Sequence, residues 1–390
     1  MKDTRESLDK PALGRRDFIK LGAAAGAVMG GAQASLAAPQ AAGQKLPEAT
    51  EQTLEGWKIG PRSTTGKPVS VDVHVHWAPE AYTKILVELG KPANAGGGSL
   101  TPLKQELDGR VKWMDAHGVQ TFIMTLSGGA PWQWVSKETA VRLAQAVNDS
   151  AVEAHNAYPD RFWGAIQIPA NDAAASLAEV NRMAGKPGIR AVHLPPTIEQ
   201  REFVFEPAFA PVLARCEELG YPLVFHPLDG EVNFYGQPHS HVTDPYLDKV
   251  RYWNTLGFPF ETATLAAKFI VNGTLDKYPK LEIVLPHAGG CFPYLAGRVG
   301  YSLTRRKYPL ARPYREYLRR FHYDSMTYDL EALRFLINLV GSDRVLVGTD
   351  NGFGARQNFE WPNAIVEKLD LKPGDENLIL NGNAKRLFHL

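Results

Sequence analysis

The sequence predicts an α/β fold: a barrel of eight parallel strands with helices between them and insertions on its C-terminal face. Three observations favour this class. Eight short runs rich in Val, Ile, Leu and Phe recur after residue 68. Most of these runs do not alternate with polar residues, which is typical of strands buried on both faces. Helix-like stretches separate the runs over about 320 residues, and such alternation is typical of parallel sheets.

Each run is short enough to be one strand of the sheet. The expected strands are Val69–His76, Val119–Leu126, Phe162–Ile168, Ile189–Leu194, Pro222–His226, Leu281–His287, Phe321–Thr327 and Val345–Asp350. Helices are expected between them, for example at Lys137–Ala157, Ala173–Met183, Pro207–Leu219, Ala263–Lys277 and Leu330–Leu339. Eight strands favour closure into a (β/α)8 TIM-type barrel. A doubly wound open sheet is the alternative, and it is disfavoured because no Gly-x-Gly-x-x-Gly motif follows an expected strand.

Two segments interrupt the alternation of strands and helices. Lys91–Leu107 is rich in Gly, and Asp229–Phe260 is rich in aromatic residues. Each segment follows an expected strand, so we expect both on the C-terminal face of the barrel. That face is where (β/α)8 barrels build their active sites.

The barrel is expected over residues 69–390. The chain before it divides into two parts. Residues 1–38 have the pattern of a twin-arginine signal peptide: Arg15 and Arg16 precede an apolar run, and Ala-x-Ala-like cleavage sequences follow. A membrane helix is the alternative, but glycines interrupt the run and it is shorter than the roughly 20 residues that a span needs. Residues 39–68 are rich in Pro, Gln and Thr and are expected to form a linker or an arm. We therefore predict export through the twin-arginine machinery to the periplasm.

The composition excludes several classes of protein. The chain has 390 residues, and its 43 Lys and Arg nearly balance its 42 Asp and Glu, which argues against a nucleic-acid binder. Cys216 and Cys291 are the only cysteines, so neither a disulfide framework nor a Cys-based zinc site is expected. After the leader no apolar run reaches about 18 residues, so the mature protein is expected not to be membrane-embedded.

Several side chains that bind metals or move protons stand at the ends of separate expected strands. They are His74, His76, His226, His287 and Asp350. All would meet at the carboxyl-terminal mouth of a barrel, and His74 and His76, two residues apart, would point to the same side of their strand. A single histidine at a strand end is more often a packed core residue, but five such groups together favour a metal site. Three histidines and a carboxylate suit a divalent ion such as Zn²⁺, with Mn²⁺ as the alternative.

Short motifs around these residues resemble those of the amidohydrolase superfamily. They are Asp72–His76, Phe225–Pro227, Pro286–Gly290 and Gly348–Asp350. The closer resemblance is to its amidohydrolase-related ("amidohydrolase 2") family, the aminocarboxymuconate-semialdehyde decarboxylase-like branch. Further matching segments are Arg110–Val119, Pro259–Thr262, Leu275–Leu281, Cys291–Arg298 and Gly382–Phe388. The resemblance runs in colinear order over roughly residues 69–390 and implies a distorted (β/α)8 barrel with a catalytic metal.

The resemblance also implies roles for individual residues. His74, His76, His226 and Asp350 would hold the metal ion, Asp350 being catalytic as well. His287 would be the neighbouring acid/base. Binuclear relatives use a modified lysine at the end of the fourth strand, where this chain has Ala191–Pro195 without lysine, so one ion is expected.

Two arginines are candidates for substrate binding by the same resemblance. Arg298 would contact a substrate carboxylate, because a guanidinium matches a carboxylate with two hydrogen bonds, and Arg110 matches a second arginine of the branch more loosely. For both, a structural role is the alternative. His193 could be an extra ligand or a substrate contact, although a packed structural role is favoured.

Other residues receive weaker assignments. The mouth aromatics Trp132, Trp134, Tyr235, Trp253 and Phe353 could line a pocket, although core packing is favoured for each. His239 and His241 are left unassigned. Structural or solvated roles are expected for His117, His155, His322 and His389.

Three functions remain open at this point. The favoured one is non-oxidative decarboxylation of a small aromatic or unsaturated carboxylic acid. The first alternative is metal-dependent hydrolysis of a lactone, amide or carbon–carbon bond. The small-molecule substrate would then be a carbonyl compound and not a carboxylate. The second alternative, a non-catalytic periplasmic binding protein, is disfavoured because every metal and acid/base side chain is present. The resemblance further implies a homodimer.

Overall fold

The computed structural model describes residues 69–126, 131–198, 201–227, 253–352 and 362–390. The predicted signal peptide, the linker and most of the aromatic-rich insertion lie outside these residues. In the described part of the chain, eight parallel strands follow one another in the order of the sequence. They are β1 (Ser70–His76), β2 (Val119–Thr125), β3 (Phe162–Gln167), β4 (Ile189–Leu194), β5 (Leu223–Phe225), β6 (Ile283–Leu285), β7 (Phe321–Asp324) and β8 (Val345–Leu346).

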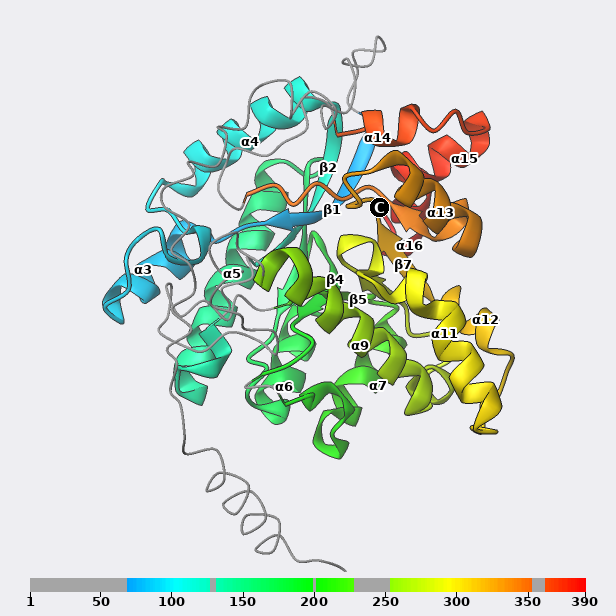
Figure 1. The fold of residues 1–390 in the computed structure, drawn as a ribbon. Coiled ribbons are helices and arrows are strands. Elements are labelled where there is room, and N and C mark those ends of the chain that lie inside the picture. The colour runs from blue at the N-terminus through cyan, green and yellow to red at the C-terminus, as the bar shows by residue number, and fades with distance from the viewer. Residues whose placement is uncertain (1–68, 127–130, 199–200, 228–252, 353–361) are drawn as a thin grey trace, which may run out of the picture. The chain divides into compact units, whose positions relative to one another are not determined.

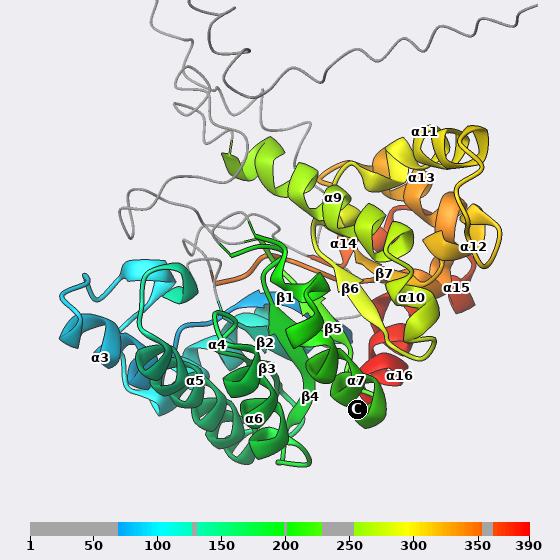
Figure 2. The same cartoon turned by 90° about the horizontal axis from the view of Figure 1, so that it is seen from below.

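The sheet closes between its first strand and the residues that follow its last strand. The backbone N–H of Val73 donates to the carbonyl of Val347 at 2.9 Å, and that of Asp350 donates to the carbonyl of His74 at 2.9 Å. These bonds join β1 to the β8 side, so the eight strands form a nearly closed barrel with helices between them (Figures 1 and 2). The predicted (β/α)8 fold is confirmed.

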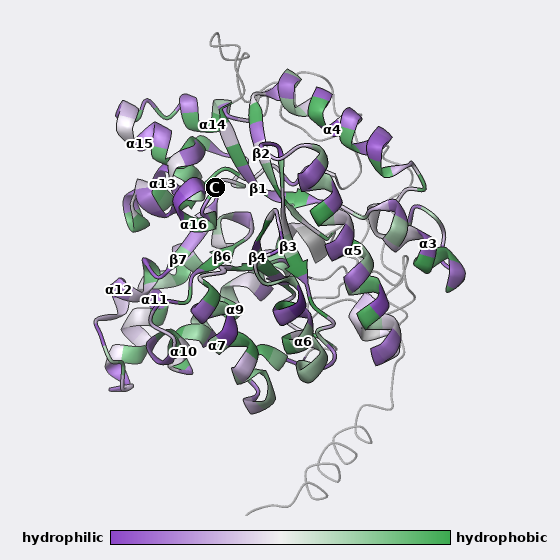
Figure 3. Cartoon of the chain, turned by 180° about the vertical axis from the view of Figure 1, so that it is seen from behind, coloured by the Kyte–Doolittle hydropathy of each residue, from purple (hydrophilic) through white to green (hydrophobic). Residues whose placement is uncertain are grey.

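The helices lie around the outside of the strands (Figure 1). They are α3 (Glu80–Glu88), α4 (Leu103–His117), α5 (Lys137–Ala157), α6 (Ala173–Met183), α7 (Ala210–Leu219), α9 (Phe258–Val271), α10 (Thr274–Lys277), α11 (Phe292–Arg305), α12 (Tyr314–Leu318), α13 (Leu330–Val340), α14 (Ala364–Glu367), α15 (Pro373–Asn377) and α16 (Asn383–Phe388). Figure 3 shows alternating hydrophilic and hydrophobic bands along α4 and α5, the pattern of a helix that buries one face.

Some boundaries differ from the expected ones for local reasons. Pro207–Phe209 forms a separate 3₁₀ turn before α7. The single helix expected over Ala263–Lys277 is two helices, because Gly273 adopts a left-handed conformation (φ +67°) between α9 and α10, which glycine tolerates without strain. The Gly-rich segment Lys91–Leu107 follows β1 and α3, and its last residues already belong to α4.

Apolar side chains pack in two layers, one inside the strands and one between strands and helices. The inner layer draws small and branched residues from β1 to β6 and from β8: Val71, Val73, Ile123, Ala165, Ala191, Val224, Val284 and Leu346. Leu387 and Phe388 of α16 pack against this layer, and Asn383 donates to the carbonyls of Ser342 and Val345, both at 2.8 Å. Because Val345 begins β8 and Ser342 lies in the 3₁₀ turn just before it, α16 closes the amino-terminal end of the barrel.

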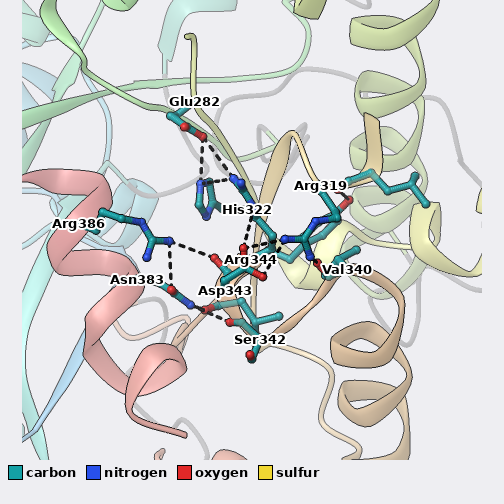
Figure 4. Close-up of polar contacts among 12 residues, drawn as sticks. Glu282, Arg319, His322, Val340, Ser342, Asp343, Arg344, Asn383 and Arg386 are labelled. Atoms are coloured by element: carbon teal, nitrogen blue, oxygen red, sulfur yellow. Dashed lines mark hydrogen bonds and ion pairs between the residues drawn. The ribbon is translucent and has the colours of Figure 1, made fainter. Parts of the chain in front are cut away.

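A polar network fixes this same end of the barrel (Figure 4). His322 Nε2 lies 3.0 Å from a carboxylate oxygen of Glu282, and Arg319 pairs with Asp343 at 2.9 Å. His322 is buried and lies at the start of β7, away from the strand ends that carry the metal-type residues. This placement agrees with the structural role expected for His322. Side-chain contacts therefore stabilise the amino-terminal end of the barrel, and the metal-type residues lie at the opposite, carboxyl-terminal end.

Candidate active site

The residues predicted to hold a metal come together at the carboxyl ends of the strands. His74 and His76 belong to β1, His226 follows β5, and Asp350 follows β8. One ligand atom from each of these four residues can be chosen so that all lie within 4.8 Å of one another. Asp350 Oδ1 lies 2.7 Å from His76 Nε2 and 3.5 Å from His74 Nε2. The arrangement is compact enough for one ion.

A bulge in β1 turns both histidines toward this point. Between Asp72 and Val75 the pairing with β2 shifts by one residue. Val73 still packs in the inner apolar layer, whereas Val75 packs in the outer one. A regular strand would keep every second side chain on one face, so an extra residue is needed to reverse the pattern. His74 and His76 then share the inner side, as their spacing predicted.

Asp72 joins the two strand ends that carry ligands. Its carboxylate accepts from the backbone N–H groups of His74 and Thr349, both at 3.1 Å, and from the hydroxyl of Thr349. Asp72 is fully buried. Burial raises the pKa of Asp72 to about 7, although the bonds from Thr349 and His74 act in the opposite direction. Asp72 therefore fixes the spacing between the β1 histidines and Asp350, the residue after Thr349.

Asp324, at the end of β7, is a site residue that the sequence analysis missed. Its Oδ2 lies 2.7 Å from His74 Nδ1, and its carboxylate also accepts from the backbone N–H groups of His287, Ala288 and Met326. A carboxylate that accepts from Nδ1 leaves Nε2 of the same ring as the atom available to a metal. His74 Nε2 is buried and has no hydrogen-bond partner, which fits a metal-facing nitrogen.

The electrostatics of the group favour a positive charge at its centre. Burial alone would lower the pKa of His74, but the hydrogen bond to Asp324 and the charges of Asp350 and Asp324 raise it to about 9. Burial would raise the pKa of Asp350, yet the hydrogen bond and charges of the histidines hold it well below its usual value. A buried site that stabilises an extra proton this way also suits a cation. Three imidazoles and a carboxylate fit a divalent ion.

His226 is oriented by its own backbone. Its Nδ1 donates to the carbonyl of Pro227 at 2.7 Å, so Nε2 is left with its lone pair. Burial, followed by the charges of the neighbouring histidines, lowers the pKa of His226 well below its ordinary value. A neutral imidazole with a fixed tautomer is the form that binds a metal.

His287 lies beside the four residues without belonging to their group. Its ring centroid is 5.1 Å from that of His74 and 5.2 Å from that of His226. Nδ1 of His287 is buried without a hydrogen-bond partner. Burial, followed by the charge of His74, lowers the pKa of His287 to about 4. The ring is therefore neutral at pH 7.

A cavity of about 510 Å³ opens beside these residues. Its described lining includes three large apolar residues, Phe258 and Pro259 of α9 and Met326 after β7. The full described lining is His76, His226, Thr255, Phe258, Pro259, His287, Ala288, Gly290, Met326, Thr327, Tyr328, Ala332 and Asp350. The volume suits a small organic molecule held against the histidines and Asp350.

Neither of the two arginines proposed for substrate binding is part of this described lining. Arg298, on α11, borders a separate surface hollow with Tyr301, Ser302, Arg305 and Arg306. Arg110, on α4, donates through Nε to Glu106 at 2.9 Å and through Nη2 to the carbonyl of His76 at 3.2 Å. Arg110 thus holds the backbone of a candidate ligand. A substrate role for either arginine stays a prediction.

His193 lies at the end of β4. One of its ring nitrogens makes a hydrogen bond, and the other has no hydrogen-bond partner. Gln167 Oε1 lies 2.7 Å from His193 Nδ1, and the amide group of Gln167 donates to the carbonyl of Ala165 at 3.1 Å. Nδ1 therefore carries the proton and Nε2 the lone pair. Nε2 is buried without a hydrogen-bond partner. The ring lies outside the four-residue group, so its role stays open between packing and a contact to the site.

The remaining assignments divide by position. Trp132 is buried in the outer apolar layer, as expected. His117 Nδ1 lies 2.6 Å from the carbonyl of Trp113, and His155 Nδ1 lies 2.9 Å from that of Phe162, which fits structural roles. Some predicted residues fall outside the described part of the chain: Tyr235, His239, His241 and Phe353.

A barrel that gathers three imidazoles, a carboxylate and a further histidine around one cavity defines a candidate metal-dependent enzyme. A model of the amidohydrolase family matches residues 71–390, and the chain belongs to this family. The 2-amino-3-carboxymuconate-6-semialdehyde decarboxylase of Dictyostelium discoideum is 27% identical over 264 residues, 66% of this chain and 69% of that one. The gamma-resorcylate decarboxylase of Rhizobium sp. is 27% identical over 297 residues, 73% of this chain and 87% of that one.

A solved structure is similar over a larger part of the chain. The crystal structure of 2,6-dihydroxybenzoate decarboxylase complexed with 2,6-dihydroxybenzoate has a TM-score of 0.65 and 25% identity. The similarity covers 83% of this chain and 99% of that one. Together these relatives confirm the resemblance to the aminocarboxymuconate-semialdehyde decarboxylase-like branch, and the chain is an enzyme. None of the helices in the described ranges combines the length and apolarity that crossing a bilayer requires.

Proposed function

We propose that the protein is a metal-dependent, non-oxidative decarboxylase of a small aromatic or unsaturated carboxylic acid. The observation that carries the proposal is the placement of His287. This neutral imidazole lines the same cavity as His76, His226 and Asp350 but stands outside the four-residue group. Such a reaction needs a metal site and a separate side chain that carries a proton, both on one cavity.

One divalent ion, with Zn²⁺ favoured and Mn²⁺ as the alternative, would be held by His74, His76, His226 and Asp350. The bound ion would supply positive charge that holds and polarises an oxygen of the substrate. The protein supplies the orientation of the ligands: Asp324 fixes the ring of His74, and the Pro227 carbonyl fixes that of His226. Asp72 keeps both strand ends in register.

His287 would deliver the proton. Loss of carbon dioxide replaces a carbon–carboxylate bond by a carbon–hydrogen bond: the carbon receives a proton, the carbon–carbon bond breaks, and its electron pair stays with the carbon skeleton. One proton from solvent is consumed for each carbon dioxide released. His287, which lines the cavity, would take up that proton and pass it on to the substrate carbon. An imidazole in this position acts as a general acid.

The relatives support the kind of substrate. Two of them are named as decarboxylases of gamma-resorcylate and of an aminocarboxymuconate semialdehyde, and a third was solved with 2,6-dihydroxybenzoate. The apolar lining residues Phe258, Pro259 and Met326 suit a ring or a diene. We also propose twin-arginine export to the periplasm and a homodimer, both on the sequence alone.

Product analysis tests the reaction. The full chain, loaded with Zn²⁺ or with Mn²⁺, would be incubated in D₂O with hydroxybenzoates, muconate-type acids, lactones and aryl amides, and the products identified by mass spectrometry. The proposal expects a product that has lost carbon dioxide and gained one deuterium on carbon. Water gained across a cleaved lactone, amide or carbon–carbon bond would instead establish a hydrolase.

A further inference from the structure

The cavity has no strong cation among its described lining residues. Apart from histidines and Asp350, the described lining residues with polar side chains are Thr255, Thr327 and Tyr328. No Lys or Arg contributes to this described part of the wall, and Arg298 and Arg110 lie elsewhere. Among the described lining residues, a neutral hydrogen-bond donor is therefore the group that could hold an anionic substrate in addition to the metal ion.

Tyr328 has an unusual backbone for its residue type. Its φ is +57°, in the left-handed region, which side chains other than glycine, asparagine and aspartate seldom adopt. His287, Ala288 and Asp350, which also line the cavity, have positive φ values as well. Strained conformations that gather at one cavity are typical of positions held for function. Glycine or asparagine would adopt this backbone conformation more easily than tyrosine does.

Hydrogen bonds on both sides of Tyr328 hold this conformation. The N–H of Thr327 donates to the carbonyl of Ser325 at 2.8 Å, and the Thr327 hydroxyl donates to the carbonyl of Asp329 at 2.8 Å. The Asp329 carboxylate then accepts from the N–H of Ala332 at 2.8 Å and caps α13. The turn is thus anchored between the end of β7 and the first turn of a helix, and it presents Tyr328 to the cavity.

The phenol of Tyr328 is a donor at any physiological pH. Burial, followed by the nearby charges of Asp350 and Asp324, raises its pKa. The two carboxylates that act on it are the candidate ligand Asp350 and the partner of His74. The phenol is therefore close enough to these two carboxylates for their charges to act on it, and Tyr328 and Asp350 line the same cavity.

We infer that Tyr328 determines specificity: its hydroxyl donates a hydrogen bond to a carboxylate oxygen of the substrate. The inference rests on the proposed function, because it takes the substrate to be a carboxylic acid. It gives a neutral residue of this chain part of the substrate recognition that the family resemblance implies for Arg298 and Arg110. Replacing the hydroxyl by hydrogen should weaken binding of a carboxylate and leave an uncharged analogue nearly unaffected.

Calorimetry with the Zn²⁺-loaded full chain tests the inference without requiring turnover. The probes are 2-hydroxybenzoate and the uncharged 2-hydroxybenzamide. Tyr328→Phe should weaken binding of 2-hydroxybenzoate about tenfold, as the loss of a hydrogen bond to a charged group predicts, and binding of the amide less than about twofold. The control is Tyr294→Phe, which removes a hydroxyl from a residue that is 82% exposed on α11 and should change neither affinity.

Each other result decides against the inference. Equal affinity of the variant and the wild type for 2-hydroxybenzoate overturns it, as does an equal loss for both probes, which would mean that Tyr328 only packs. Failure of the wild type to bind 2-hydroxybenzoate overturns it too. Zinc content, measured on every sample, should be the same in both variants. If binding depends on Tyr328 but no substrate loses carbon dioxide, the inference stands and the proposed function fails.

Discussion

Asp324 accepts a hydrogen bond from Nδ1 of His74 at 2.7 Å, and this contact ties β7 to the histidine pair of β1 across 250 positions of the chain. The same carboxylate accepts from the backbone N–H groups of His287 and Ala288. One buried aspartate thus orients a candidate metal ligand and also fixes the turn that carries the candidate proton carrier.

Asp324→Asn should weaken metal binding roughly 10- to 100-fold, the usual cost of losing a carboxylate that orients a metal-binding histidine. Competition with a chelator measures the dissociation constant. Asp343→Asn is the matched control, because Asp343 pairs with Arg319 at the opposite end of the barrel. Equal metal affinity of Asp324→Asn and wild type would show that Asp324 does not serve the metal.

His287→Asn should lower turnover by roughly 10²- to 10⁴-fold, the range that general acid catalysis contributes, while the protein keeps its metal. His287 stands outside the four-residue group, so elemental analysis should find the same metal content as in the wild type. Full activity of the variant would remove His287 from the reaction. Loss of the ion would instead make His287 a ligand.

Thr349→Val should destabilise the fold by about 1–3 kcal/mol, because the buried Asp72 carboxylate loses the hydroxyl that donates to it. Urea denaturation of the metal-free chain measures this change. Thr264→Val serves as control, since its hydroxyl bonds to the carbonyl of Phe260 in its own exposed helix turn. A Thr349 variant as stable as this control would show that the link between Asp72 and Thr349 is dispensable.

Glu261 predicts a pH dependence of stability. It is buried on α9, and Thr197 donates to it at 2.6 Å; burial raises its pKa from 4.5 to about 7, against the effect of Thr197. Between pH 4.5 and 7 the unfolded chain loses a proton that the folded chain keeps, so stability falls as the pH rises. Above pH 7 the cost is constant, at about 3 kcal/mol.

Glu261→Gln removes this titration. The difference in free energy of unfolding between the variant and the wild type should therefore grow from pH 4.5 to 7 and then level off. Urea denaturation at a series of pH values, at one fixed metal concentration, gives this difference. A difference that does not vary with pH would show that Glu261 ionises normally in the folded protein.

The barrel could be predicted from the sequence because strands and helices are each marked by a pattern of neighbouring residues. The helices Lys137–Ala157 and Ala173–Met183 have the bounds that their patterns indicate, and β1 to β4 agree with the expected strands to within one residue at each end. The later strands, β5 to β8, are shorter than expected. Their apolar runs continue past the last paired residue into turns that carry His226, His287 and Asp350, and no pattern of hydrophobicity marks where pairing ends.

The candidate ligands were predictable because the carboxyl ends of parallel strands meet at one place. Asp324 was missed although it ends an expected strand, because its role depends on the distance between β7 and β1, which the sequence does not contain. A carboxylate at the end of a buried strand was the available indication. The direction of Arg298 was equally hidden, since its motif does not say which side of α11 faces the cavity.

Measuring how carbon dioxide release depends on metal is the most direct test that the reaction requires one ion at this site. The full chain would be stripped of metal with a chelator, Zn²⁺ or Mn²⁺ returned in steps, and carbon dioxide release from the accepted acid measured at each step. A single metal site predicts no release without metal and full release at one ion per chain. Release that persists without the ion, or that requires two ions per chain, would contradict a single site formed by His74, His76, His226 and Asp350.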